Sequence, residues 1–188
     1  IKNISIMKLS KDGQSVTGSK TQINCDCLGV SGGWTPAVHL FTQSGGKLKF
    51  DYDDNVFKPN KYPSDQISIG ACNGEFDLDT IIKNFNNNVK TYLGIEKTSY
   101  ENLNISASKE ILKKNIWLLP SIKPIGKTKS FVDFQNDATA KDIKLALREG
   151  FRSIEHVKRY TTTGMGTDQG KLGNMHALGI ISDTSGIK

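Results

Sequence analysis

The chain carries few of the features that mark a membrane or secreted protein. It has no apolar run near the roughly 20 residues that a membrane-spanning helix needs, and no signal-peptide pattern. Its three cysteines, Cys25, Cys27 and Cys72, are an odd number, which argues against a disulfide framework. With 188 residues, 36% of them hydrophobic, it can bury one ordinary core or two small ones. We therefore predict a soluble, globular, cytoplasmic protein.

Clusters for metal or nucleophilic chemistry are also missing. Cys25 and Cys27 alternate as on one face of a strand, but no second Cys or His pair lies nearby to complete four metal ligands. We predict that both are buried as small apolar residues. His39 and His176 have apolar neighbours and are predicted in a core or an interface, and His156 in solvent. We predict no catalytic residue and no metal ligand in this chain.

The net charge is +6, with a pI near 9.1. A basic chain can bind nucleic acid, but no aromatic-studded basic stripe or recognised motif supports that function here. We therefore predict no nucleic-acid partner, and keep a basic nucleic-acid binder only as a distant alternative that salt-sensitive duplex binding would reveal.

Short strands and one helix are predicted in the first half. Residues 1–23 alternate around turn signals and predict a hairpin, and residues 24–31 predict a buried strand that ends at a Gly-Gly turn. Further strands are predicted at 47–51, 55–57 and 67–74. Apolar residues at three-and-four spacing predict a helix over 77–93, with acidic residues in its first turn and Gly94 as its cap.

Residues 95–128 are polar and rich in lysine, and predict a surface connector. Residues 129–188 predict a compact helical module. Thr139, with Asp142 three positions later, predicts the N-cap of its first helix, which stops at Gly150. Ser153 predicts the cap of a second helix, ended by Gly164.

Two stretches, residues 30–50 and 148–171, resemble the α subunit of heterotetrameric sarcosine oxidase. The resemblance implies an α+β chain: residues 1–94 as the C-terminal part of a two-dinucleotide-binding (FAD/NAD type) α/β domain, 95–128 as connector, and 129–188 as a small helical domain similar to bacterioferritin-associated ferredoxins. Because the sequence starts inside a predicted strand and stops without a closing element, we expect a fragment of a longer chain.

The Gly-Gly-Trp-Thr-Pro turn after the predicted strand is where the family places backbone against NAD. The resemblance implies contacts from Gly33, Trp34, Thr35, Leu40 and Thr42. Glycines bring amide groups close to a ligand, and threonine hydroxyls can bond ribose or phosphate oxygens. The alternative is a structural strand end with Trp34 in the core. No Gly-x-Gly-x-x-Gly fingerprint occurs, so we expect no tight NAD binding by this chain alone.

Ferredoxin domains of the related type hold a [2Fe–2S] cluster with four cysteines. The resemblance places Asp133, Gln135, Asp168 and Gly173 at the corresponding positions. Because such clusters are held by thiolates, and this module contains none, we predict no iron–sulfur cluster.

The Thr- and Gly-rich turn 158–171 offers cations, hydroxyls and backbone amides together, which are the groups that bind a phosphate or a flavin edge. The family carries FMN at the α/β subunit interface. We predict that six residues lie at or near that surface: Arg159, Thr161, Thr162, Thr163, Gln169 and Lys171. The alternative is that Tyr160, Met165 and the threonines only pack and cap the helix.

The resemblance implies a share in an enzyme complex that oxidatively demethylates sarcosine to glycine with oxygen, gives peroxide, and passes the one-carbon unit to tetrahydrofolate. The implied partners are the β, γ and δ subunits, with FAD on the β subunit and tetrahydrofolate on a C-terminal domain absent here. Two alternatives stay open: the α subunit of a related proline or opine dehydrogenase, and a non-enzymatic partner-binding module.

Overall fold

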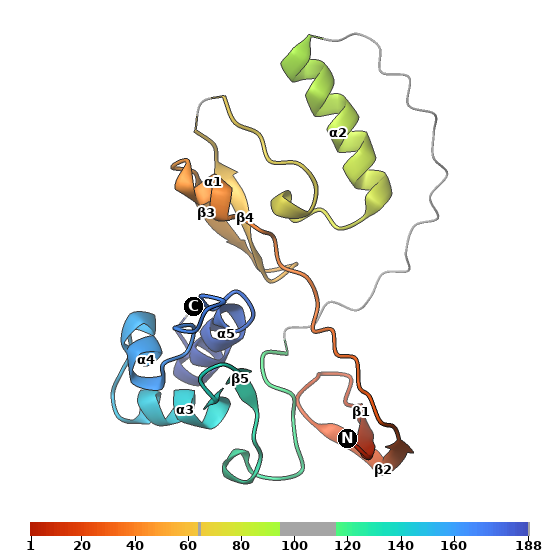
Figure 1. Cartoon of the computed structure of the whole chain (residues 1–188), viewed down its shortest axis with the longest axis vertical. Helices are drawn as coiled ribbons and strands as arrows, with labels where there is room; N and C mark the ends of the chain where they lie inside the picture. Colours follow the sequence, from red (N-terminus) through yellow and green to blue (C-terminus); the bar gives the residue numbers. More distant parts are fainter. Residues whose placement is uncertain (64, 95–115, 188) are drawn as a thin grey trace. The chain divides into compact units, whose positions relative to one another are not determined.

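A computed structural model describes residues 1–63, 65–94 and 116–187. The chain divides into two compact units, residues 1–28 with 114–188, and residues 29–113. Within the described ranges the strands form three separate two-stranded antiparallel sheets (Figure 1). The chain is therefore of the mixed α+β class, but the described residues contain no parallel sheet such as the predicted α/β dinucleotide domain would have contributed.

The predicted N-terminal hairpin is confirmed. Strand β1 (Asn3–Leu9) pairs with β2 (Val16–Asn24), and a Ser10–Asp12 hydrogen bond of 2.5 Å closes the turn between them. The predicted buried strand at 24–31 is wrong, because β2 ends at Asn24 and no regular element follows before residue 39. Cys27 is exposed and Cys25 half-buried, so their predicted burial is also wrong.

The second unit starts with the short helix α1 (His39–Gln43), which buries Phe41, and the hairpin of β3 (Lys47–Asp51) and β4 (Val56–Lys61). This hairpin confirms the strands predicted at 47–51 and 55–57. The strand predicted at 67–74 is wrong: Gly70–Asn73 form a 3-10 turn, η1, entered and left through glycines with φ of 80° and 81°.

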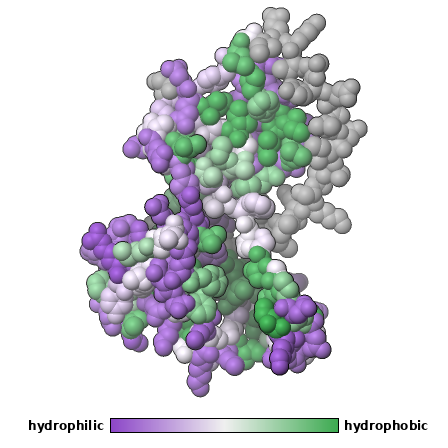
Figure 2. Space-filling view, viewed as in Figure 1, coloured by the Kyte–Doolittle hydropathy of each residue, from purple (hydrophilic) through white to green (hydrophobic). Residues whose placement is uncertain are grey.

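Helix α2 (Leu78–Leu93) follows, as predicted, within one residue. The Asp77 carboxylate accepts a hydrogen bond from the Thr80 amide at its N-terminus, and Gly94 ends it in the left-handed conformation. None of its residues is buried, and Leu78, Phe85 and Leu93 are 53%, 44% and 65% exposed. Apolar side chains accordingly gather on the visible surface of the unit that contains α2 (Figure 2).

Residues 116–187 form the best-packed part of the chain. The 3-10 turn η2 (Ile125–Lys127) and the sheet of β5 (Phe131–Asp133) and β6 (Ala138–Thr139) lead into three helices, α3 (Ala140–Arg148), α4 (Ile154–Thr161) and α5 (Asn174–Ser185). Their shared core includes Ile143, Val157 and Ile180, all at most 2% exposed. Each such side chain contributes about 1.5–3 kcal/mol of burial free energy.

The caps predicted for this module are largely confirmed. The Thr139 hydroxyl and the Asp142 carboxylate form a complete capping box on α3. Ser153 precedes α4 in the N-cap position but makes no side-chain bond there, and Thr162, rather than Gly164, ends the helix in the left-handed conformation. The sequence patterns missed α5. In the described part of the chain, no helix combines the length and the apolarity that crossing a membrane requires.

Candidate functional site

The turn after β5 and the loop between α4 and α5 are joined by side-chain hydrogen bonds, which we call the polar clasp (Asp133, Gln135 and residues 164–170). The Gly164 amide donates to Asp133 Oδ2 at 2.7 Å. The Thr167 amide and hydroxyl donate to Gln135 Oε1 at 2.6 and 2.8 Å. Two segments about 30 residues apart in sequence are thereby fixed against each other.

Asp133 is the buried centre of the clasp, at 6% exposure. Burial alone raises the pKa of its carboxyl, but amide hydrogen bonds from Gly164, Asn136 and Gln135 outweigh that effect and hold the pKa below its usual value. The carboxylate is therefore ionised at neutral pH and acts as a fixed acceptor. A group in that state stabilises the loop; it is not poised to transfer protons.

Two glycines let the clasp loop close tightly around Asn174. A Cβ at Gly164 or at Gly170 would lie 2.1 Å from Asn174 Oδ1, and both glycines have positive φ, 72° and 75°. At Gly173 a Cβ would lie 2.5 Å from the carbonyl oxygen of Val132. The loop is thus packed directly onto β5 and the start of α5.

An iron–sulfur cluster does not fit this arrangement. Asp133, Gln135 and Asp168 stand at positions that the ferredoxin resemblance implies for cluster ligands. The oxygens of Asp133 and Gln135 accept the clasp hydrogen bonds, and the Asp168 carboxylate accepts from the Gly170 amide at 3.1 Å. Gly173 provides no side chain. None of the chain's three cysteines lies in residues 116–188, so the thiolates a cluster needs are absent from the module.

The six residues predicted near flavin divide into two groups. Thr161 and Thr163 are 9% and 2% exposed, and their hydroxyls bond each other at 2.8 Å. Thr161 also donates to the Val157 carbonyl at 2.8 Å. These two hydroxyls are used within the domain at the end of α4, which favours the alternative interpretation for them. That they lie near an FMN surface stays a prediction. The exposed members are Arg159, Thr162, Gln169 and Lys171.

Several backbone amides of the same loop already donate hydrogen bonds within the domain. Met165 donates to the Thr162 carbonyl, Gln169 to that of Gly166, and Lys171 to that of Asp168, at 3.0 to 3.2 Å. Gly164 and Thr167 donate to the clasp. These amides are therefore not available to a ligand, and the exposed cations beside them are the side chains of Arg159 and Lys171.

The residues predicted to contact NAD lie together in the second unit, on the extended stretch before α1 and on α1 itself. All five are exposed: Gly33, Trp34, Thr35, Leu40 and Thr42. Trp34 and Leu40 are each 79% exposed, which rules out the alternative in which Trp34 belongs to the core. Gly33 has a φ of 121°, with open space where a Cβ would stand. The Thr42 hydroxyl donates to the His39 carbonyl at 2.9 Å.

Sequence patterns missed an apolar surface around the polar clasp. Phe134, Met165 and Leu172 are 75%, 58% and 77% exposed. Phe134 follows Asp133 and Met165 follows Gly164, and these two neighbours are hydrogen-bonded to each other. Leu172 precedes Gly173, which packs closely against Val132. One feature of the sequence could have revealed this surface. Large apolar residues occur inside a Gly-rich polar turn, where packing alone does not require them.

The described residues hold no group of three or more His, Cys, Asp or Glu side chains that could bind a metal ion. His176 is exposed and meets Trp117 edge-on at 6.2 Å, and His39 is exposed, so neither lies in a core as one prediction allowed. His156 is exposed, as predicted.

Comparison with known proteins finds similarity in the helical module and along most of the chain. The family described as the sarcosine oxidase A3 domain matches residues 127–188. The sarcosine oxidase subunit alpha of Rhizobium meliloti (strain 1021) is 35% identical over 182 residues, 90% of this chain and 17% of that protein. The proteins of the same name from Corynebacterium sp. strains P-1 and U-96 are 32% and 31% identical over 91% and 97% of the chain.

This chain spans only about a fifth of the length of these relatives, 17% to 20%. Within that span, the similarity extends across both units, so it does not rest on the helical module alone. The chain is therefore homologous to a segment of the sarcosine oxidase α subunit, and its residues 127–188 are a sarcosine oxidase A3 domain.

Proposed function

We propose that this chain is part of the α subunit of a sarcosine oxidase, a complex that oxidises the N-methyl group of sarcosine. Removal of two electrons from the amine and hydrolysis yield glycine and a one-carbon unit, and dioxygen takes up the electrons as peroxide. The observation that carries the proposal is 31–35% identity over at least 90% of the chain to α subunits of that name.

For the A3 domain, we propose a place at the interface that holds FMN between α and β subunits. The support is a clasp-stabilised loop with Arg159, Thr162, Gln169 and Lys171 exposed on it or beside it. When bound, FMN would supply one- and two-electron transfer. The cations would meet its phosphate, and the clasp would keep the loop in one conformation, which lowers the entropy cost of binding.

For the second unit, we propose a contribution to NAD binding from Gly33, Trp34, Thr35, Leu40 and Thr42. The support is their joint exposure in one short stretch: an indole for stacking, a glycine without a Cβ, and two hydroxyls. The phosphate-binding glycine fingerprint is not in the sequence, so these residues would complete a site whose main contacts lie elsewhere. FAD and tetrahydrofolate belong to other parts of the proposed complex, which also contains β, γ and δ subunits.

The function is tested by recovering the native protein from its source cells with an antibody against residues 129–188. The eluate is assayed for sarcosine-dependent peroxide, with and without tetrahydrofolate, and for proline and opine oxidation. Sarcosine-dependent peroxide from a flavin-containing complex supports the proposal. Activity only on proline or an opine would replace sarcosine oxidase with the related dehydrogenase.

The FMN surface is tested in that complex by Arg159→Gln with Lys171→Gln. We expect flavin content to fall by about tenfold, because two charge-assisted contacts to a phosphate are lost. Lys141→Gln, an exposed change on α3, is the matched control and should retain flavin. Full FMN content in the double variant would remove these cations from the site.

A second candidate function, a partner-binding module without enzymatic activity, is favoured by the exposed Phe134, Met165 and Leu172. Such a module would be recovered with a flavoprotein partner, yet the double variant above would lose neither flavin nor partner. Substituting Phe134 and Leu172 by serine would then release the partner, while leaving the buried core of residues 127–188 intact.

A further inference from the structure

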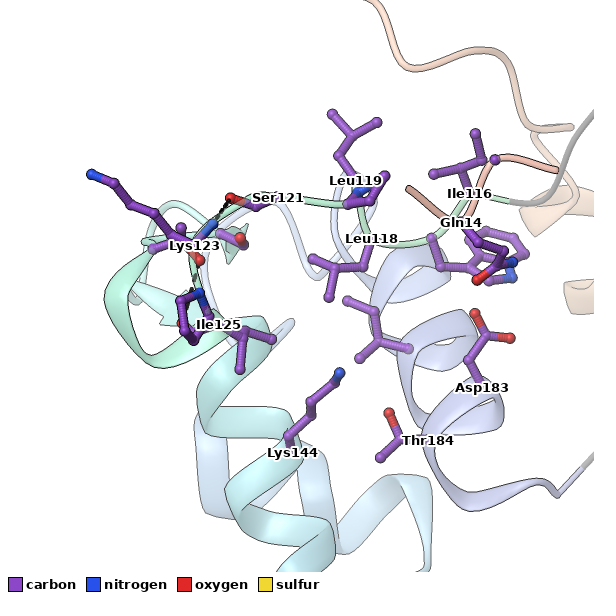
Figure 3. Close-up of a pocket in the computed structure, with 17 residues that line it drawn as sticks. Gln14, Ile116, Leu118, Leu119, Ser121, Lys123, Ile125, Lys144, Asp183 and Thr184 are labelled. Carbon is purple, nitrogen blue, oxygen red and sulfur yellow. Dashed lines mark hydrogen bonds between the residues drawn. The ribbon is translucent and has the colours of Figure 1, made fainter. Parts of the chain in front are cut away.

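A cavity of about 500 Å³ lies under residues 116–125, which we call the arch, between the arch and helices α3 and α5 (Figure 3). Its volume falls within the roughly 300–1,000 Å³ range of small-molecule sites. It shares none of the residues of the polar clasp, and its lining includes residues that precede the A3 domain. Neither NAD nor FMN is assigned to it by the proposed function.

Packing holds both ends of the arch. Near one end, the indole of Trp117 lies directly on Gly179 of α5, where a Cβ would be 2.1 Å from the ring. Near the other, Ile125 packs against the buried core that α3 shares with α5. Pro120 and Pro124 restrict the backbone between these two contacts. The cavity is therefore a space under a fixed span of chain, not a gap left by a loose loop.

The lining of the cavity is amphipathic, and one cationic side chain points into it. Figure 3 shows Lys144 directed from α3 into the cavity, and Lys123 directed away from it. Lys144 is half-buried, and the described residues provide its ammonium group with neither an acidic partner nor a hydrogen-bond acceptor. Leu118, Ile125 and Ile180 line the space beside it.

We propose that this cavity binds a small organic anion with an apolar body. Its single carboxylate or sulfonate would pair with Lys144, and its hydrocarbon part would lie against Leu118, Ile125 and Ile180. Partial burial strengthens the charge pair relative to one at a water-exposed surface. Asp183 is the one acidic residue in the cavity lining, and it disfavours a ligand with a second negative charge.

The test uses the 188-residue chain with Trp34→Phe, which leaves Trp117 as its only tryptophan. The probe is anilinonaphthalene sulfonate, compared with its uncharged analogue phenylnaphthylamine. We expect both to accept energy from Trp117. We further expect Lys144→Met to raise the Kd of the sulfonate about tenfold and that of the neutral analogue less than twofold. Lys141→Met, three residues away on the exposed side of α3, is the matched control and should change neither.

A further variant, Thr184→Phe, distinguishes this site from binding to the apolar face of α2. The phenyl ring adds bulk to the cavity lining from α5 and should abolish the Lys144-dependent binding. Circular dichroism and the melting temperature confirm that each variant is folded. Three results would each overturn the proposal: no probe binding near Trp117, equal Kd changes for both probes in Lys144→Met, or unchanged binding in Thr184→Phe.

Discussion

In residues 127–188, three short helices enclose their apolar residues in a common core, whereas in residues 29–94 the longest helix of the described chain leaves its apolar face open. Ile143 and Ala146 of α3 are completely buried, but α2 has no buried residue although its apolar periodicity is equally clear. Phe41 and Val56 are the buried apolar residues of that second region. Amphipathic pattern thus predicts a helix, while burial depends on what the helix meets.

Polar contacts differ between the regions in the same way. The A3 domain places a buried carboxylate, Asp133, in the polar clasp and surrounds it with amide donors. The second region instead uses a half-exposed group, in which Lys58 pairs with Asp51 at 2.8 Å and with Asp54 at 2.5 Å across the β3–β4 hairpin. Buried, fully bonded groups contribute more to stability than half-exposed ion pairs. The two regions should therefore respond unequally to equivalent substitutions.

The largest contrast is expected in the core. Ile143→Ala removes a side chain with no exposed surface and should lower the free energy of unfolding by about 2–5 kcal/mol. Ile82→Ala in α2, a half-buried site, should cost about 1 kcal/mol or less. Urea unfolding of the chain with Trp34→Phe measures both, followed by Trp117 fluorescence for the first region and by circular dichroism for the whole chain. Equal losses would mean that the two regions are packed alike.

The next effect concerns the polar clasp. Asp133→Asn replaces one acceptor oxygen by an amide that faces N–H donors, and should lower stability by about 1.5–3 kcal/mol at neutral pH. Because the folded-state pKa of Asp133 lies below its unfolded value, its contribution is complete above about pH 4 and is lost as pH falls through the folded pKa. Urea midpoints measured from pH 7 to pH 2 should fall less steeply in Asp133→Asn than in the parent. Parallel curves would remove the carboxylate from this role.

Two glycines with similar backbone angles give a matched pair, one in each region. Gly170→Ala, at a φ of 75°, introduces a Cβ into the Asn174 side chain and should cost about 2–3 kcal/mol. Gly94→Ala, at a φ of 65°, meets open space and should cost only the backbone strain of about 1 kcal/mol. Thermal melts of both variants give the comparison. A Gly94 variant as damaged as the Gly170 variant would show that backbone angle, not close packing, sets the cost.

The smallest effect is expected at the ion group of the second region. The hydrogen bond from Lys58, together with those from the Asp54 and Asp53 amides, lowers the pKa of Asp51 to about 2. Lys58→Met keeps the aliphatic stem over Gly74 but removes the charge, so stability should fall by only about 0.5–1 kcal/mol. Carbon-detected NMR titration should show the pKa of Asp51 rising toward its ordinary value of 3.8. No rise would show that the amide hydrogen bonds alone set this pKa.

Local signals predicted α3 and α2 well, because each has a capping side chain at its start, Thr139 or Asp77, and regular apolar spacing behind it. Helix α5 was missed for a physical reason. Gly179 weakens its local helix signal, and the benefit of that glycine comes from Trp117, more than 60 positions earlier in the chain. The strand predicted at 24–31 was wrong for the opposite reason. Its apolar run suggested a buried strand, but no described strand pairs with it.

At the candidate site, the residue types were a better guide to the chemistry that is excluded than to the contacts that the side chains make. The absence of cysteine from the A3 module was decisive about a cluster. The sequence did not predict which hydroxyls and amides remain free. The Thr161 and Thr163 hydroxyls bond each other, and several loop amides donate to Asp133, Gln135 and nearby carbonyls. Such pairings are set by tertiary closure of the loop, which sequence spacing does not encode.

The polar clasp has a consequence for how the loop between α4 and α5 reaches its final conformation. Asp133 and Gln135 accept hydrogen bonds from the amides of Gly164 and Thr167, which lie about 30 residues further along the chain. The loop is thus held by side chains of the domain itself. We therefore expect its closure to be part of folding, completed when β5 and α5 come together.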